Sequence, residues 1–179
     1  MYRPFPHDLP ISKPGEELLF LREEKIRFMQ DVLFFIDCEL HNATKPILQE
    51  YGIGHAHHRL MQFVCHCSGA SVSEICKLLG ITKQSLNRVL RDVLELGYIE
   101  YRTNAEDRRK KSLYLTPQGE KIEEKLFQLQ RKQFLRAFRE APNNIHIEGF
   151  QRILYGMLSV ESKQLLELHS SQKPDKGKE

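Results

Sequence analysis

Residues 71–119, SVSEICKLLGITKQSLNRVLRDVLELGYIEYRTNAEDRRKKSLYLTPQG, decide the fold of this chain. The S-x-x-E at the start is a capping box, and it predicts a helix over 72–79 that Gly80 ends in the left-handed turn conformation. Thr82 can cap a second helix over 83–96 only a few residues later. Two short helices joined by a tight turn that contains glycine form a helix-turn-helix.

A β-hairpin is expected directly after the second helix. Residues 98–102 alternate in character and are rich in β-formers, and residues 112–115 form the returning strand. The polar residues 103–109 make the loop between them. Thr116 and Pro117 then supply an N-cap and a first-turn proline for a helix over 117–140.

The helix over 83–96 has two different faces. Apolar residues recur at threes and fours along one of them, at Leu86, Val89, Leu90, Val93 and Leu94. The opposite face carries the amides and guanidinium groups that read base edges in a DNA groove, at Gln84, Asn87, Arg88 and Arg91. Lys83 and Ser85, near the helix start, are placed for backbone phosphates. This pattern predicts a recognition helix for duplex DNA.

The loop of the hairpin concentrates positive charge at Arg108, Arg109, Lys110 and Lys111. An arginine on such a projecting loop can enter a narrow minor groove, where the negative potential is strongest. From Lys77 to Lys111 nine lysines and arginines face five acidic residues, a local excess of +4 in a chain whose net charge is +3. The positive excess therefore lies in one segment, as expected for a phosphate-facing surface.

The run from Ser71 to Gly119 resembles the MarR (multiple antibiotic resistance regulator) family of transcriptional regulators. The most specific parts are LELGYIEYR, residues 94–102, and DRRKKSLYLTPQG, residues 107–119. The second part matches the family pattern D-x-R-x-x-x-h-x-L-T-x-x-G, in which h is apolar. The long flanking helices resemble the family in their layout only.

The resemblance implies a homodimer whose first and last two helices interlock and whose two winged lobes read a near-palindromic operator. It implies that Arg109 reaches the minor groove and that Asp107 holds it or the wing in place. Arg102 matches an arginine at the end of the first wing strand, and residues 83–88 lie where the family reads the major groove. The family typically responds to small phenolic or lipophilic ligands or to oxidants, and no residue here identifies such an effector.

The expected fold class is mainly α, a winged helix-turn-helix with a small antiparallel β-wing and a helical dimerisation region formed by the N- and C-terminal helices. The expected boundaries are an extended, proline-rich arm over 1–15, an N-terminal dimerisation region over 16–52, a DNA-binding lobe over 53–116, C-terminal dimerisation helices over 117–169 and a disordered tail over 170–179. The first long helix is expected to end at Asn42, and Pro46 can open a separate short turn of helix to Tyr51. One final helix is expected over 145–169.

Two sensing alternatives stay open beside this interpretation. The histidines of 55–58 with Cys65-His66-Cys67 suggest a metal sensor, but the spacing is not the paired C-x₂-C form of structural zinc sites. A surface histidine cluster with buried cysteines is favoured instead. Cys38 and Cys76 are expected to be buried in apolar surroundings, and Cys65 and Cys67 are the least constrained positions for a redox-sensing thiol.

The remaining function classes have weaker support. No phosphate-binding glycine loop, nucleophile elbow or zinc-protease motif is present, so we expect neither an enzyme nor a bound cofactor or metal. A winged helix that docks proteins without binding DNA would lose the cations of the hairpin loop, which this chain keeps. The longest apolar run, 32–36, is too short to cross a membrane, and the chain start lacks a secretory layout, so we expect a cytoplasmic protein without a membrane partner.

Overall fold

A computed structural model describes residues 23–103 and 111–170 of the chain. By their contacts the residues divide into two units, Met1–Glu39 and Leu40–Glu179, and α1 (Glu23–Glu50) contributes residues to both. The expected arm over 1–15 and residues 171–179 of the expected tail lie outside the described residues, and Ser170, the first residue of that tail, is the last residue of a helix.

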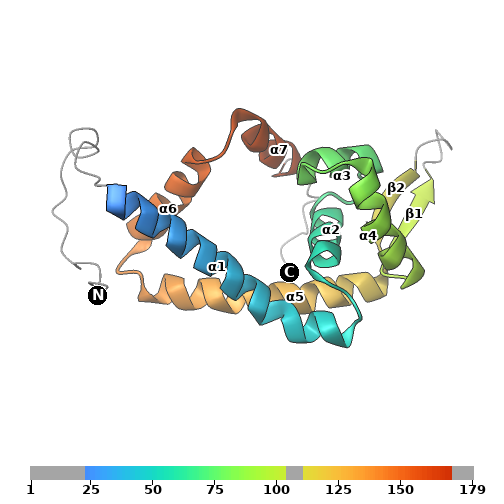
Figure 1. The fold of residues 1–179 in the computed structure, drawn as a ribbon, viewed down its shortest axis with the longest axis horizontal. Helices are drawn as coiled ribbons and strands as arrows, with labels where there is room; N and C mark the ends of the chain where they lie inside the picture. The colour runs from blue at the N-terminus through green and yellow to red at the C-terminus, as the bar shows by residue number, and fades with distance from the viewer. Residues whose placement is uncertain (1–22, 104–110, 171–179) are drawn as a thin grey trace, which may run out of the picture. The chain divides into compact units, whose positions relative to one another are not determined.

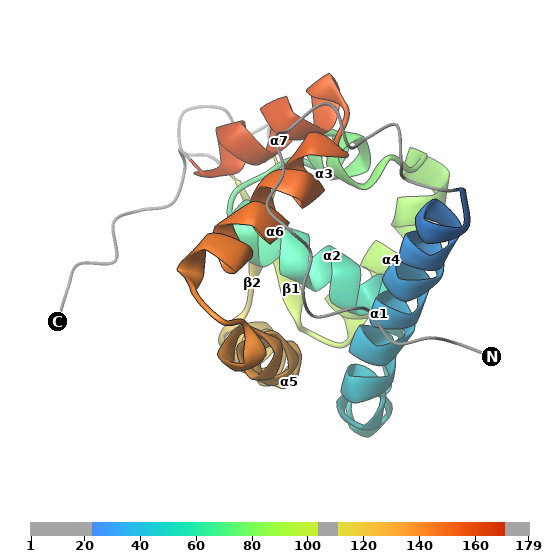
Figure 2. The same cartoon turned by 90° about the vertical axis from the view of Figure 1, so that its left-hand side faces the viewer.

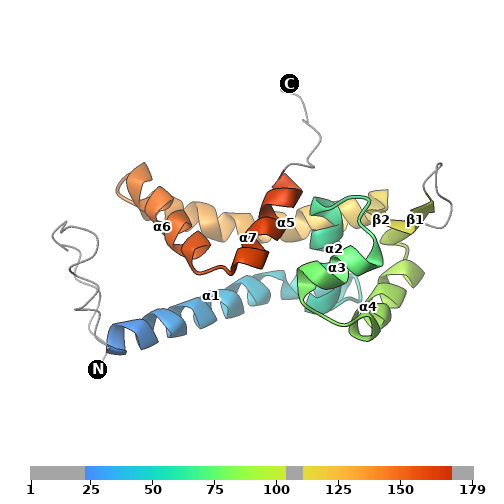
Figure 3. The ribbon, with the colours of Figure 1, turned by 90° about the horizontal axis from the view of Figure 1, so that it is seen from above.

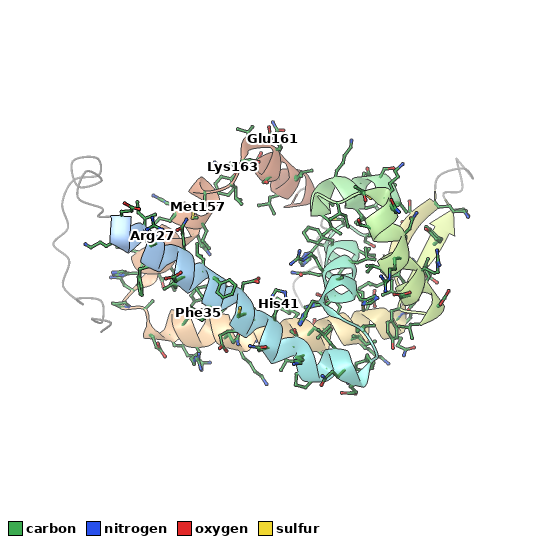
Figure 4. The ribbon with its side chains drawn as sticks, in the orientation of Figure 1. Arg27, Phe35, His41, Met157, Glu161 and Lys163 are labelled. Atoms are coloured by element: carbon green, nitrogen blue, oxygen red, sulfur yellow. The ribbon has the colours of Figure 1, made fainter. Side chains whose placement is uncertain are left out.

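The described part of the first unit is the beginning of α1. Arg27 pairs with Glu23 one turn earlier on the helix surface. Large apolar side chains are exposed along this part of the helix at Ile26, Met29, Val32, Phe34, Phe35 and Ile36. The rings of Phe34 and Phe35 meet edge to face with their centroids 5.6 Å apart (Figure 4 labels Phe35).

The helix α1 does not end before Pro46, and the expectation of an end at Asn42 was wrong. A proline inside a helix removes one backbone donor, so the Asn42 carbonyl loses its usual partner. Packing on both sides of Pro46 compensates this loss, because Thr44 and Leu48 are buried in the core of the second unit. Tertiary burial therefore carries the helix about two turns beyond Asn42, to Glu50.

The second unit contains the end of α1 and all the other elements. They are α2 (His55–His66), α3 (Val72–Leu79), α4 (Lys83–Glu95), β1 (Ile99–Thr103), β2 (Lys111–Leu115), α5 (Pro117–Glu140), α6 (Asn144–Gly156) and α7 (Val160–Ser170). Figure 1 shows α2, α3, α4 and the β1–β2 hairpin gathered together. The fold class expected from sequence, mainly α with a winged helix-turn-helix, is confirmed.

The core of this lobe forms around α2, which contacts α3, α4, α5 and β2. Fully buried side chains come from each of these elements and from β1: Leu60, Met61, Val64, Ile75, Leu86, Val93, Ile99, Leu113, Ile122 and Leu126. Burying aliphatic side chains of this size contributes about 1.5–3 kcal/mol each relative to exposure. The lobe is thus held by one apolar cluster that fixes α4 and the hairpin against α2.

The two strands pair antiparallel, with Ile99 opposite Leu115 and Thr103 opposite Lys111. The segment before α3 adds to this hairpin, because the Gly69 N–H donates to the Leu113 carbonyl and the Leu113 N–H donates to the Ala70 carbonyl, both at 2.9 Å. Figure 3 shows the hairpin beside α4. The wing is therefore hydrogen-bonded to the chain that enters the helix-turn-helix.

The last part of the chain forms two helices, so the expectation of one helix over 145–169 was wrong (Figure 2). α6 ends with Gly156, and the chain turns through Met157 and Leu158 before α7 starts. The Ser159 hydroxyl accepts the Ser162 N–H at 3.1 Å, which caps the first turn of α7. None of the described helices has the length and apolar character that crossing a membrane requires.

Candidate nucleic-acid interface

The turn between α3 and α4 forms as its residue types require. The Ser71 hydroxyl accepts the Glu74 N–H and the Glu74 carboxylate accepts the Ser71 N–H at 2.7 Å, which completes the expected capping box. Gly80 ends α3 with φ +63°, a conformation that residues with a Cβ adopt only with strain. The Thr82 hydroxyl then accepts the Ser85 N–H at 3.2 Å and starts α4.

The helix α4 buries one face and exposes the other, as its periodicity predicts. Leu86, Leu90 and Val93 are buried against the lobe. The side chains expected to face DNA are exposed: Lys83, Gln84, Ser85, Asn87, Arg88 and Arg91. Together they form a polar surface along α4, which we name the α4 outer face.

The polar side chains of the α4 outer face differ in whether they form hydrogen bonds within the protein. The Ser85 hydroxyl lies 3.0 Å from the Thr82 hydroxyl and belongs to the N-cap. The side chains of Gln84, Asn87, Arg88 and Arg91 make no hydrogen bond or ion pair with any other residue in the described part of the chain. Their donors and acceptors are consequently available to an external partner.

The hairpin holds the Arg102 guanidinium in a defined orientation. The Arg102 guanidinium bonds to the Glu100 carboxylate at 2.7 Å and lies over the ring of Tyr114, 4.5 Å from its centroid. Lys111 lies over the ring of Tyr101 on the other face of the same hairpin, at 5.5 Å. Asp107, Arg108, Arg109 and Lys110, which the sequence predicts at the tip of the wing, lie outside the described residues.

The base of the hairpin is tied to two other helices through tyrosines. The Tyr98 hydroxyl donates to the Tyr51 carbonyl at 3.2 Å, and Lys125 of α5 donates to the Tyr51 hydroxyl at 2.6 Å. This hydrogen bond raises the pKa of Lys125, so its ammonium form is retained. The end of α1, the start of β1 and α5 therefore meet at one polar junction.

Sequence reasoning missed one contact of α4 altogether. The His57 ring of α2 lies with Nε2 3.0 Å from the Asp92 carboxylate of α4. The two residues are far apart in sequence, and neither belongs to a recognisable motif. The helical period places Asp92 at the edge of the α4 outer face, and this position was the only sign in the sequence that Asp92 could contact a neighbouring helix.

The expected surface cluster of histidines is only partly at the surface, and for His58 the expectation was wrong. His58 is 6% exposed, on the side of α2 that faces the core. Burial, helped by the positive charge of His55, His41 and Arg59, lowers the pKa of His58 to about 4. The rings of His41 and His55 meet edge to face at 4.5 Å. Within residues 23–103 and 111–170 no three His, Cys, Asp or Glu side chains are placed to hold a metal ion together.

The cysteines also depart in part from expectation. Cys76 and Cys67 are buried as predicted, whereas Cys38 is only half-buried and Cys65 is exposed, so for these two the expectation of burial was wrong. Burial raises the pKa of Cys67, with a smaller contribution from Glu74. The Cys67 thiol is therefore kept protonated, which lowers its reactivity. Burial likewise raises the pKa of Glu123 of α5, whose carboxyl interacts with the Cys65 side chain.

Comparison with known proteins places these features in a family. Residues 51–110, which include α2, α3, α4 and β1, match the model of the MarR family. The HTH-type transcriptional regulator PetP of Rhodobacter capsulatus is 36% identical over 144 residues, which cover 80% of this chain and 86% of PetP.

Solved structures share the fold at low sequence identity. The MepR–DNA complex of S. aureus superimposes with a TM-score of 0.52 at 19% identity, over 72% of this chain and 96% of MepR. CouR from Rhodococcus jostii RHA1, bound to p-coumaroyl-CoA, superimposes with a TM-score of 0.58 at 15% identity, over 72% of this chain and 90% of CouR.

Proposed function

The chain belongs to the MarR family of transcription regulators, and we propose that it acts as a homodimer that reads a two-fold-symmetric DNA operator. In this proposal α4 enters the major groove, and the wing reaches the adjacent minor groove. The observation that carries the proposal is the α4 outer face. Its two amides and two guanidinium groups are exposed without partners among the described residues, while the opposite face of α4 is buried.

The proposed contacts divide into two kinds. Gln84, Asn87, Arg88 and Arg91 contact base edges, for which amide and guanidinium groups have suitable bidentate geometry. Lys83 and Ser85 at the start of α4, Arg102 on β1 and Arg108 with Lys110 on the loop contact phosphates, and Arg109 enters the minor groove with Asp107 orienting it. The DNA-bound MepR structure supports this assignment by fold alone.

In this proposal a second copy of the chain packs against the exposed apolar side chains of the terminal helices and buries them. On α6, α7 and the turn between them Ile145, Ile153, Met157 and Val160 are each at least 64% exposed, and the beginning of α1 exposes the apolar set named above (Figure 4 labels Met157). Soluble monomers seldom leave so many large apolar groups in water. A dimer would also supply two α4 helices to two half-sites.

The proposal extends to regulation. Because CouR is bound to p-coumaroyl-CoA in its crystal, the fold accommodates a small ligand in at least one neighbour. We propose that this chain is a repressor in the cytoplasm whose DNA binding responds to a small molecule. A reporter gene behind its operator is expected to be silenced by the protein, and activation of the reporter would contradict repression.

The deciding experiment is selection of duplexes from a random pool with the purified protein, followed by footprinting of the selected DNA. We expect a near-palindrome with half-sites centred about one helical turn apart, and binding that weakens steeply with salt. Light scattering should give twice the mass of the chain. Failure to enrich any sequence, a single asymmetric half-site or a monomer at working concentrations would refute the proposal.

A further inference from the structure

His57 connects the start of α2 to the recognition helix through both of its ring nitrogens. Nδ1 lies 2.9 Å from the backbone nitrogen of Gly54, and Nε2 lies 3.0 Å from Oδ2 of Asp92. The His57 side chain is 20% exposed and that of Asp92 is 46% exposed, so the bond is partly shielded from water. A contact of this kind fixes the distance between α2 and the second half of α4.

The hydrogen bonds also determine which nitrogen of His57 carries the proton. The Gly54 N–H can only donate, so Nδ1 must offer its lone pair. In the neutral ring Nε2 then bears the hydrogen and donates it to the Asp92 carboxylate. The neutral imidazole can thus donate to Asp92, because the Gly54 N–H fixes Nδ1 as the acceptor and leaves Nε2 as the donor.

The position of Asp92 on α4 gives this bond a consequence for DNA reading. Asp92 follows Arg88 by four residues, and side chains at this spacing are neighbours on a helix surface. A carboxylate released at Asp92 would therefore pair with the Arg88 guanidinium. In the structure the carboxylate bonds to His57, and Arg88 has no ion-pair partner in the described part of the chain.

We propose that His57 is a positioning residue for DNA recognition: it anchors α4 through Asp92 and thereby keeps the Arg88 guanidinium available to the duplex. The inference rests on the proposed function, because it assigns a role within the same interface. His57 itself contacts no base in this proposal. Its effect passes through one hydrogen bond to a residue one turn from Arg88.

A simpler role for His57 would be to cap α2 by accepting the Gly54 N–H. The two roles need different nitrogens, so variants can separate them. In His57→Asn the side-chain oxygen takes the place of Nδ1 and keeps the cap, but the side chain is too short to reach Asp92. In His57→Ala both bonds are lost, and in Asp92→Ala the carboxylate that could pair with Arg88 is removed.

The test measures affinity for a duplex that wild-type protein selects from a random pool, with wild type, the three variants and the double variant His57→Ala/Asp92→Ala. We expect His57→Ala and His57→Asn to weaken binding by about three- to tenfold, the value of one ordinary, partly exposed hydrogen bond. In the Asp92→Ala background the His57→Ala change should weaken binding less than it does in wild type, because the pair is already broken and only the cap of α2 is lost. Thermal unfolding of each variant verifies that the lobe is folded.

The outcomes distinguish this inference from the proposed function. If wild type selects no sequence, the proposed function fails. If wild type selects a duplex and His57→Asn binds that duplex as well as wild type does, His57 only caps α2 and the inference is wrong. The same conclusion follows if His57→Ala weakens binding equally in the wild-type and the Asp92→Ala backgrounds. Nitrogen-15 spectra of the free dimer show which nitrogen of the His57 ring carries the hydrogen and so provide a test without DNA. A hydrogen on Nδ1 would also contradict the inference about His57.

Discussion

Arg102 lies across the hairpin over the ring of Tyr114, with the guanidinium carbon 4.5 Å from the ring centroid. The two side chains occupy the same face of the wing, because Arg102 pairs with Ser112 and Tyr114 pairs with Glu100 in the strand register. The Glu100 carboxylate, two residues earlier on the same face, also bonds to the guanidinium at 2.7 Å. A cation near the loop end of the hairpin is thus oriented by residues of the two strands.

Replacing the Tyr114 ring should loosen Arg102 and weaken DNA binding. Tyr114→Leu removes the aromatic face, a contact worth about 0.5–1 kcal/mol at an exposed site. We expect a loss of affinity of about two- to fivefold that is similar for all sequences, measured by fluorescence anisotropy. Tyr114→Phe keeps the ring and is the matched control. A loss in Tyr114→Phe as large as in Tyr114→Leu would show that the hydroxyl, and not the ring under Arg102, is responsible.

Substitutions on the α4 outer face should change base preference. Asn87→Ala or Arg88→Ala removes one base-edge contact, which we expect to cost about 1–3 kcal/mol and to relax the selected sequence at one position in each half-site. Repeating the selection with each variant measures this. Arg131→Ala, an equal change of charge on α5 outside the helix-turn-helix and the hairpin, is the control. If Arg88→Ala and Arg131→Ala weaken all sequences alike, Arg88 does not read bases.

Gly119 should not tolerate a side chain. A Cβ at this third residue of α5 would lie 2.0 Å from the carbonyl oxygen of Tyr98, which is backbone and cannot turn away. Gly119→Ala is expected to destabilise the protein by about 1–3 kcal/mol, measured by urea unfolding. Gly149→Ala is the control, because its Cβ meets nothing within 4 Å, and it should stabilise α6 by up to about 1 kcal/mol. Equal stability of wild type and Gly119→Ala would show that α5 and β1 do not approach this closely.

Acidification should destabilise the lobe through His58. Its pKa is about 4 in the folded protein and 6.5 in the unfolded reference, so between these values the unfolded chain binds a proton that the folded chain does not. The free energy of unfolding therefore falls as the pH is lowered from about 6.5 toward 4, by about 2–3 kcal/mol in total, and this group has no effect above that range. Urea unfolding at a series of pH values measures the slope.

Two variants show whether that slope belongs to His58. His58→Leu removes the titrating ring, and the slope between pH 4 and 6.5 should become smaller. Met61→Leu changes a fully buried residue of the same helix without altering its charge, and the slope should stay. A slope that persists in His58→Leu would assign the acid sensitivity to other groups.

Much of the helix-turn-helix follows from neighbouring residues. The capping box of Ser71 and Glu74, the left-handed Gly80 and the Thr82 cap each act within a few positions of the chain, so residue type and spacing were sufficient. The exposure of Arg88 and the burial of Leu90 likewise follow from the period of one helix. The wing strands were located within one residue of their observed ends.

The departures arise where distant segments meet. Pro46 predicts the end of a helix from local geometry, yet α1 continues because Thr44 and Leu48 are buried against the lobe. His58 lies in a run of histidines, a polar segment that is typical of a protein surface. Its burial depends on which face of α2 packs against the core. The break between α6 and α7 at Ser159 was overlooked because an uninterrupted apolar period runs across it.

The sequence by itself determined the two helices, their turn and the side chains that α4 turns outward, because caps, glycines and helical period are local properties. Only the tertiary structure decided that His57 bonds to Asp92, 35 residues away, and that Gly119 lies against the Tyr98 carbonyl. Such contacts join positions that no short-range pattern relates. They exist because one shared apolar core around α2 brings α4, the hairpin and α5 to fixed positions.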